Sequence, residues 1–74
     1  MFTPREEEVL ELVILGLTNK EIAENLVISY STAKVHISNI MKKINARSRI
    51  EVVTISLLNE YVDTQKIKSM LTKK

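Results

Sequence analysis

Residues 18–44 decide the fold and read TNKEIAENLVISYSTAKVHISNIMKKI. Thr18 is followed three positions later by Glu21, which is the spacing of a capping box, where each side chain accepts a hydrogen bond from the other residue's backbone N–H. This pattern predicts a helix that begins after Thr18 and ends near residue 26. Its apolar residues recur at the spacing of one buried face, at Ile22, Ala23 and Leu26.

Residues 27–29, Val-Ile-Ser, separate this helix from the next one. The segment is too short for a strand with its own partner and too apolar for an open loop. We therefore predict a tight turn in which Ile28 reaches the core and Ser29 caps the following helix. Two helices joined by so short a turn form a helix-turn-helix.

The second helix of this motif is predicted over residues 30–44, where side chains separate into two faces at about 100° per residue. One face is apolar and holds Ala33, Ile37, Ile40 and Ile44, with Met41 at its margin. The opposite face is polar, basic and short-chained, and it holds Ser31, Lys34, Val35, Ser38 and Lys42, with Asn39 beside them. Since Val35 has no packing purpose there, this outer face is predicted to contact a partner.

A further helix is predicted on the N-terminal side, over about residues 4–15. Thr3 and Glu6 form another capping box, Pro4 suits the first helical position, and Gly16 suits the left-handed conformation that ends a helix. The core stripe of this helix is Val9, Leu12 and Val13.

On the C-terminal side, Ser48 and Glu51 form a third capping box and begin a helix that reaches Asn59 or Tyr61. This helix is apolar on more than one side, so it needs two partners, one of which is another chain in our hypothesis. The candidates for that contact are Ile55 and Leu58.

The predicted fold class is therefore all-α, a four-helix helix-turn-helix domain over residues 1–62. Residues 63–74 form a basic C-terminal tail, with Ile67, Met70 and Leu71 at helical spacing among lysines. The sequence leaves two alternatives for this tail, a short fifth helix or a frayed end.

Charge is distributed unevenly along the 74 residues, although the formal net charge is only +2. Residues 1–24 carry six acidic and two basic side chains, whereas residues 25–50 carry five basic side chains and no acidic one. The five are Lys34, Lys42, Lys43, Arg47 and Arg49. Such a block is typical of a polyanion-binding surface, while a solvated charged face, the alternative, usually mixes signs.

Composition argues against an enzyme. The chain has no cysteine and one glycine, so it offers no thiolate metal site and no glycine-rich phosphate loop, and no nucleophile and base are paired in the pattern. His36 is the only histidine, and a structural hydrogen bond is its favoured role over metal binding. We expect no metal, cofactor or small-molecule ligand. With no signal peptide and no apolar run of about 18 residues, we expect a cytoplasmic protein without membrane contact.

Three motifs in order, Thr3-Pro4-Arg5-Glu6, Asn19-Lys20-Glu21-Ile22-Ala23 and STAKVHISNI at 31–40, closely resemble the LuxR/FixJ (NarL/GerE) type of helix-turn-helix domain over residues 2–60. The resemblance implies a four-helix transcription-factor domain, often the C-terminal output module of a response regulator or of a ligand-sensing regulator. It implies that helix 30–44 reads the major groove and that the next helix forms a two-fold dimer contact.

Carried over by residue, the resemblance assigns base contacts to Lys34, Val35 and Ser38. A lysine can donate to guanine O6 and N7, and a valine can touch a thymine methyl. The family often has valine where this chain has Ala33, a modest core change. The position of Ser38 varies in the family and is sometimes a longer basic or amide side chain, so readout there is expected to be weaker or water-mediated.

Phosphate contacts set affinity and its salt dependence more than sequence choice. The candidates are Lys20, Tyr30, Ser31, Thr32, Asn39, Lys42, Lys43 and Arg47, and Arg49 is a further basic side chain that could anchor a phosphate.

The expected partner is double-stranded DNA, bound as a homodimer on inverted or direct half-sites about one helical turn apart. RNA polymerase is a further candidate partner. Two alternatives stay open: a promoter-recognition module like sigma-factor region 4, and a helical protein-interaction domain that does not bind nucleic acid. The basic, acid-free middle of the chain argues against the second alternative.

Overall fold

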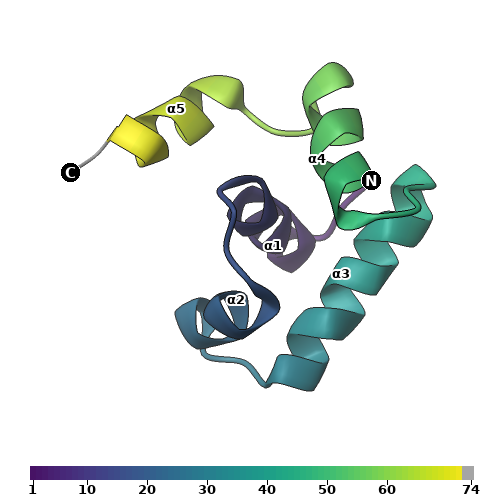
Figure 1. The fold of residues 1–74 in the computed structure, drawn as a ribbon, viewed down its shortest axis with the longest axis vertical. Helices are drawn as coiled ribbons and strands as arrows, with labels where there is room; N and C mark the ends of the chain where they lie inside the picture. Colours follow the sequence, from purple (N-terminus) through teal and green to yellow (C-terminus); the bar gives the residue numbers. More distant parts are fainter. Residues whose placement is uncertain (73–74) are drawn as a thin grey trace.

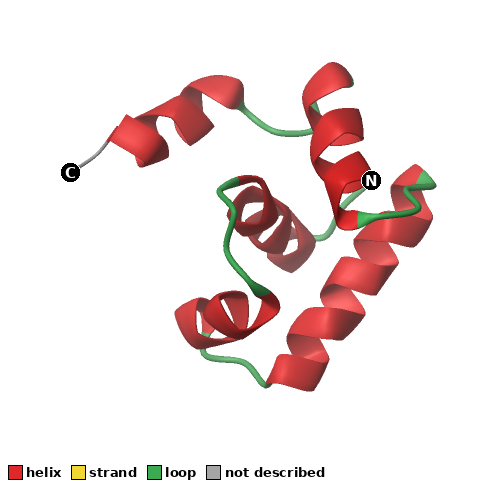
Figure 2. Ribbon diagram, in the orientation of Figure 1, coloured by secondary structure: helices red, strands yellow, loops and turns green. Residues whose placement is uncertain are grey.

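Helices make up the regular structure of residues 1–72, which are the residues that the computed structural model describes (Figure 1). They are α1 Pro4–Ile14, α2 Asn19–Leu26, α3 Tyr30–Ile44, α4 Arg49–Leu58 and α5 Thr64–Thr72. No strand occurs within these described residues (Figure 2), which confirms the all-α class. The predicted tail is helical over α5, and its last residues, Lys73 and Lys74, lie outside the described part of the chain.

Two of the three predicted capping boxes are complete. Thr3 Oγ1 accepts from the Glu6 N–H at 3.1 Å and Glu6 Oε1 accepts from the Thr3 N–H at 3.0 Å. The same pair of bonds, 3.1 and 2.8 Å long, joins Thr18 and Glu21 at the start of α2. These bonds satisfy N–H groups that have no partner inside a helix, which explains why α1 and α2 begin at these residues.

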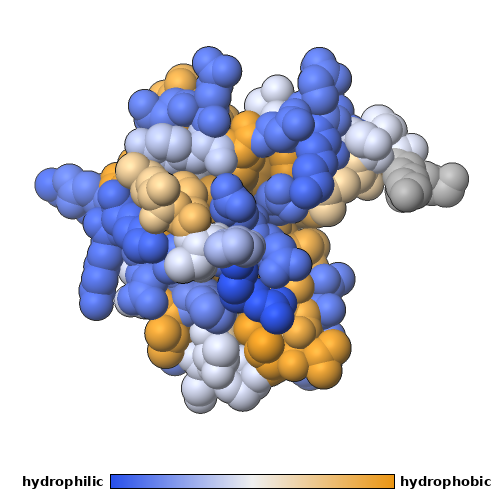
Figure 3. All heavy atoms as spheres, turned by 180° about the vertical axis from the view of Figure 1, so that it is seen from behind, coloured by the Kyte–Doolittle hydropathy of each residue, from blue (hydrophilic) through white to orange (hydrophobic). Residues whose placement is uncertain are grey.

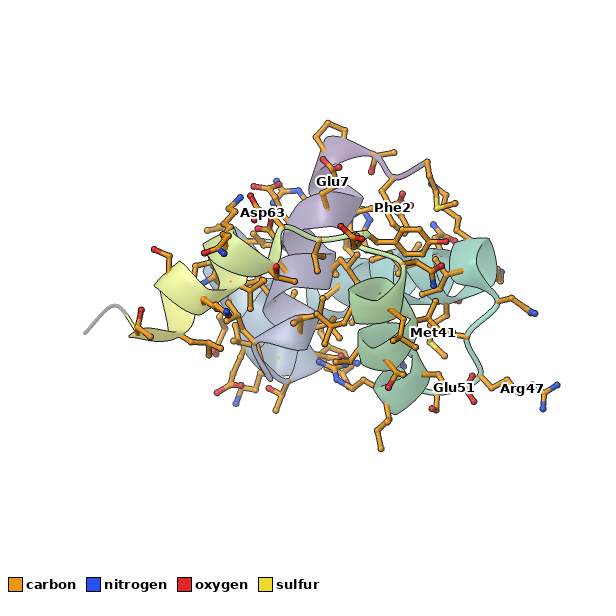
Figure 4. The ribbon with its side chains drawn as sticks, turned by 90° about the horizontal axis from the view of Figure 1, so that it is seen from above. Phe2, Glu7, Met41, Arg47, Glu51 and Asp63 are labelled. Carbon is orange, nitrogen blue, oxygen red and sulfur yellow. The ribbon has the colours of Figure 1, made fainter. Side chains whose placement is uncertain are left out.

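The third predicted box is only half formed. Ser48 Oγ accepts from the Glu51 N–H at 3.2 Å, but Glu51 Oε1 accepts from the N–H of Arg47, at 2.8 Å, and not from that of Ser48. The φ angle of Ser48 is −151°, against −70° at Thr3, so its N–H is turned away from the helix. Figure 4 shows Arg47 and Glu51 together where α4 begins.

Left-handed residues end the first three helices. Gly16 has a φ of 93° just after α1, as predicted. Val27 ends α2 with a φ of 56°, and the Ile28 N–H then donates to the Ala23 carbonyl at 2.9 Å. Asn45 ends α3 with a φ of 57°. The left-handed residue at 27 turns the chain between α2 and α3, so residues 27–29 form the corner of a helix-turn-helix.

The core lies between α1, α2 and the inner side of α3, with α4 across the far end of α3 (Figure 1). The predicted inward residues of α1 and α3 are buried, and Ile28 packs against them from the turn. The sequence did not predict Leu10, Val62 or the polar Ser56, whose hydroxyl is fully buried and has no hydrogen-bond partner within the described residues.

None of the helices described in residues 1–72 is both long and apolar enough to span a membrane.

Candidate nucleic-acid interface

The outer face of α3 is exposed along its length. Lys34, Ser38 and Lys42 are exposed, and so is 56% of Val35. Ala33, Ile37 and the other predicted inward residues have less than a tenth of their surface exposed. In Figure 1, α3 lies along one edge of the molecule, and none of the labelled helices covers its outer side. The predicted division of α3 into an apolar and a polar face is confirmed.

The first turn of α3 brings an aromatic ring to the predicted base-reading lysine. Lys34 Nζ lies 5.6 Å from the centroid of the Tyr30 ring, within the range of a cation–π contact. Helical side chains point back toward the N-terminus, so a pair four residues apart meets in this way. The contact holds the Lys34 side chain over the first turn of α3.

Thr32 has a local partner in the same turn. The Ser29 hydroxyl donates to Thr32 Oγ1 at 2.8 Å and accepts from the Thr32 N–H at 3.0 Å. This confirms Ser29 as the cap of α3 and gives the Thr32 hydroxyl a structural role beside its predicted phosphate role.

An open recess of about 360 Å³ lies where α2, α3 and α4 begin. Its lining residues are Thr18, Asn19, Lys20, Tyr30 and Arg49. The recess brings together Lys20 and Tyr30, two phosphate candidates from different helices. The exposed Lys20 ammonium group and the Tyr30 hydroxyl make its lining suitable for an anionic group.

Arg49 joins the beginnings of two helices at this recess. Its Nη1 donates to Asn19 Oδ1 at 2.7 Å, and its Nη2 donates to the Leu17 carbonyl. The sequence placed Arg49 in the cationic block and among the phosphate candidates, but it did not predict these bonds, since no spacing rule relates position 49 to positions 17 and 19.

Lys43 differs from the other phosphate candidates because its ammonium group already has partners. Its Nζ lies 2.5 Å from Glu6 Oε1 and 3.1 Å from the Met1 carbonyl, and 6.0 Å from the centroid of the Phe2 ring. Glu6 is only 4% exposed. Lys43 therefore ties the end of α3 to the beginning of α1.

The ion pair with Lys43 changes the pKa of the Glu6 carboxyl group. The hydrogen bond from Lys43 lowers the pKa of Glu6 below its usual value of 4.5, with help from the Thr3 N–H, and outweighs the opposite effect of burial. A smaller electrostatic effect of the nearby His36 acts in the same direction. The hydrogen bond predicted for the half-buried His36 is not found, since its side chain bonds to no residue within 1–72.

Acidic residues gather elsewhere, beside a second recess of about 340 Å³ between α1 and α5. Glu7, Glu8, Glu11 and Asp63 line it together with Lys66, whose Nζ lies 3.1 Å from Glu11 Oε2. Figure 4 shows Glu7 and Asp63 on the side of α1 away from Arg47. The face opposite to the view of Figure 1 is largely hydrophilic, with separate hydrophobic patches toward its edges (Figure 3).

A family model described as bacterial regulatory proteins, luxR family, matches residues 1–56, which include α1 to α3 and most of α4. This chain belongs to the luxR family. The resemblance seen in its three motifs is thereby confirmed, and the family is one of regulatory proteins. Helix α5 lies beyond the matched residues.

Curated proteins similar to this luxR-family chain are regulators too. The uncharacterized transcriptional regulatory protein YxjL of Bacillus subtilis is 44% identical over 61 residues, which are 82% of this chain and 28% of YxjL. The nitrate/nitrite response regulator protein NarL of Escherichia coli K12 is 49% identical over 49 residues, 66% of this chain and 23% of NarL. The oxygen regulatory protein NreC of Staphylococcus carnosus is 40% identical over 63 residues, 85% of this chain and 29% of NreC. The chain thus spans less than a third of the length of these relatives.

The luxR-family helix α4 has the exposed apolar side that the sequence predicted. Ile50 and Leu58 are each 78% exposed and Leu57 is 40% exposed. Of the two predicted dimer residues, Leu58 lies on this side, whereas Ile55 is partly buried against the core.

Proposed function

We propose that this chain binds specific sites on double-stranded DNA as part of a transcription regulator, with α3 in the major groove. The observation that carries the proposal is the exposed outer face of α3, which is basic and short-chained on a helix whose other face is buried. At 1.5 Å per residue, the 15 residues of α3 span about 22 Å, and the major groove is wide enough to admit such a helix.

Lys34, Val35 and Ser38 are the proposed base contacts. All three are exposed and lie on two successive turns of α3. Lys34 would donate to guanine O6 and N7, Val35 would touch a thymine methyl, and Ser38 would bond directly or through water.

Residues that contact phosphates would lie around this outer face of α3. We assign this role to Lys20, Tyr30, Ser31, Thr32, Asn39, Lys42 and Arg47. Lys43 is the weakest candidate, because a phosphate would have to compete with the buried Glu6 carboxylate for its ammonium group.

A homodimer would place two such helices on neighbouring half-sites. The exposed side of α4 supports it, because Ile50 and Leu58 are each 78% exposed and Leu57 is 40% exposed, so these side chains would lose water in a two-fold contact. The names of the relatives, among them a nitrate/nitrite response regulator, support a place in a response regulator. Within such a cytoplasmic regulator, residues 1–62 would be the DNA-binding domain, and RNA polymerase would be a further partner.

Selection of binding sites from random duplex DNA tests this function. We expect one enriched sequence, arranged as two half-sites about one helical turn apart, and an affinity that falls steeply with salt. Recovery of unenriched DNA at every salt concentration would leave only non-specific binding. Indifference to DNA at low salt would favour a protein-interaction domain.

A further inference from the structure

Arg49, the first residue of α4, is bonded to residues 30 and 32 positions earlier in the chain. Its two terminal nitrogens donate to Asn19 Oδ1 and to the Leu17 carbonyl. These acceptors flank Thr18, the N-cap of α2. A guanidinium group presents its donors in a rigid planar fork, so this pair of bonds fixes both the position and the direction of the chain that enters α2.

Little else connects these two helices. Helix α2 packs mainly on α3, and α4 packs on α3 and α1, whereas α2 and α4 share no comparable contact. The first turn of α2 therefore depends on Arg49 for its attachment to α4.

The turn that Arg49 holds carries a phosphate candidate. Lys20 follows Asn19 directly, is exposed, and lines the recess together with Tyr30 and Arg49. A long, flexible lysine loses less conformational freedom on binding when the backbone beneath it is already fixed. The orientation of the first turn of α2 therefore determines how well the Lys20 ammonium group can bind a phosphate.

We propose that Arg49 is a positioning residue for DNA-backbone binding: it fixes the first turn of α2 so that Lys20 reaches a phosphate, and it does not itself contact DNA. This inference rests on the proposed function. It departs from the sequence-based prediction of Arg49 as a phosphate contact, because each terminal nitrogen of its guanidinium already donates a hydrogen bond within the protein.

A double-mutant cycle of Arg49→Gln and Lys20→Gln tests the inference, with the full chain and a selected duplex at several salt concentrations. Lys20→Gln should weaken binding by up to about fivefold, as for one exposed ion pair, and should reduce the slope of log affinity against log salt by about 0.9. Arg49→Gln should weaken binding by no more than Lys20→Gln does, and its salt slope should fall by no more than that of Lys20→Gln, because the only phosphate contact it can weaken is that of Lys20. In the Lys20→Gln background, Arg49→Gln should have no further effect.

Lys42→Gln is the matched control, since Lys42 lies on α3 and is not held by Arg49. In that background the full effect of Arg49→Gln should remain. Additivity with Lys20→Gln would overturn the inference, as would a further fall in the salt slope when Arg49→Gln is added to Lys20→Gln, because this fall would mean that Arg49 contacts a phosphate itself. A Lys20→Gln variant with wild-type affinity would also overturn it.

Asn19→Ala provides a second variant if Arg49→Gln fails to fold. It removes one of the two acceptors without a change of charge, so it should weaken binding only when Lys20 is present, with a fall in the salt slope no larger than that of Lys20→Gln. The proposed function fails separately, if the wild-type chain itself selects no DNA sequence.

Discussion

At the scale of the residue, three consecutive glutamates near the N-terminus differ in their exposure and in their hydrogen bonds. Glu7 and Glu8 are exposed, whereas Glu6 is buried and receives hydrogen bonds from Thr3 and Lys43. The sequence identifies Glu6 as the partner of the cap at Thr3. It does not reveal the bond to Lys43, which lies 37 positions away and meets Glu6 only after α1 and α3 have packed.

The free energy of unfolding should therefore depend on pH through the ionisation of Glu6. Its pKa is lowered in the folded state, so the folded state binds this proton less readily than the unfolded state does. The contribution is fully present above the unfolded value near 4.5 and is lost as pH falls through the lowered folded value. Urea unfolding of the wild type and of Glu6→Gln between pH 6 and pH 3 should show a flatter pH dependence for the variant. Parallel curves would contradict this assignment, and Glu7→Gln, at an exposed position, is the control.

At the scale of the element, much of the fold could be predicted because its signals are local. The caps at Thr3, Thr18 and Ser29 and the stop at Gly16 are decided by residues within four positions of one another, and each is present. The two faces of α3 follow from the helical repeat. The links made by Arg49 and Lys43 could not be predicted, because they depend on where separate helices meet.

Val27 is the helix end at which the residue type fits the backbone conformation least well. A β-branched residue in the left-handed region is strained, and Val27 is 90% exposed, so it gains little from packing. Val27→Asn should stabilise the domain by about 1 kcal/mol, since asparagine tolerates this conformation. Thermal and urea unfolding measure the effect.

Asn45 supplies the matched control for that substitution. It ends α3 with a nearly identical φ, so Asn45→Val should destabilise the domain by a similar amount, about 1 kcal/mol. Equal stability of the Val27→Asn variant and the wild type would show that the corner between α2 and α3 is not strained.

At the scale of the whole molecule, the cationic face of α3 and the apolar side of α4 are both exposed in one chain. In the proposed dimer, α4 would set the distance between two copies of α3. Leu58→Asp would bury a charge in that contact, so it should abolish cooperative binding to two half-sites while single half-site binding stays within about twofold. Gel-shift titrations on one-site and two-site duplexes measure both quantities.

Leu71→Asp is the control for the dimer, because Leu71 is 57% exposed on α5, away from α4. It should leave cooperativity intact. Unchanged cooperativity in Leu58→Asp would remove the exposed side of α4 from the dimer. Ile55 is unsuitable for this test, since it packs partly on the core and a charge there would destabilise the monomer.

The recognition face of α3 is tested most directly by the affinity of Lys34→Ala for the selected site and for a scrambled duplex of equal length. Lys34 is placed over base edges, so its removal should cost about 1–3 kcal/mol on the selected site and much less on the scrambled one, which relaxes specificity. Lys42→Ala should weaken both duplexes alike. Equal losses on the two duplexes for Lys34→Ala, or no loss at all, would contradict the docking of α3 in the major groove.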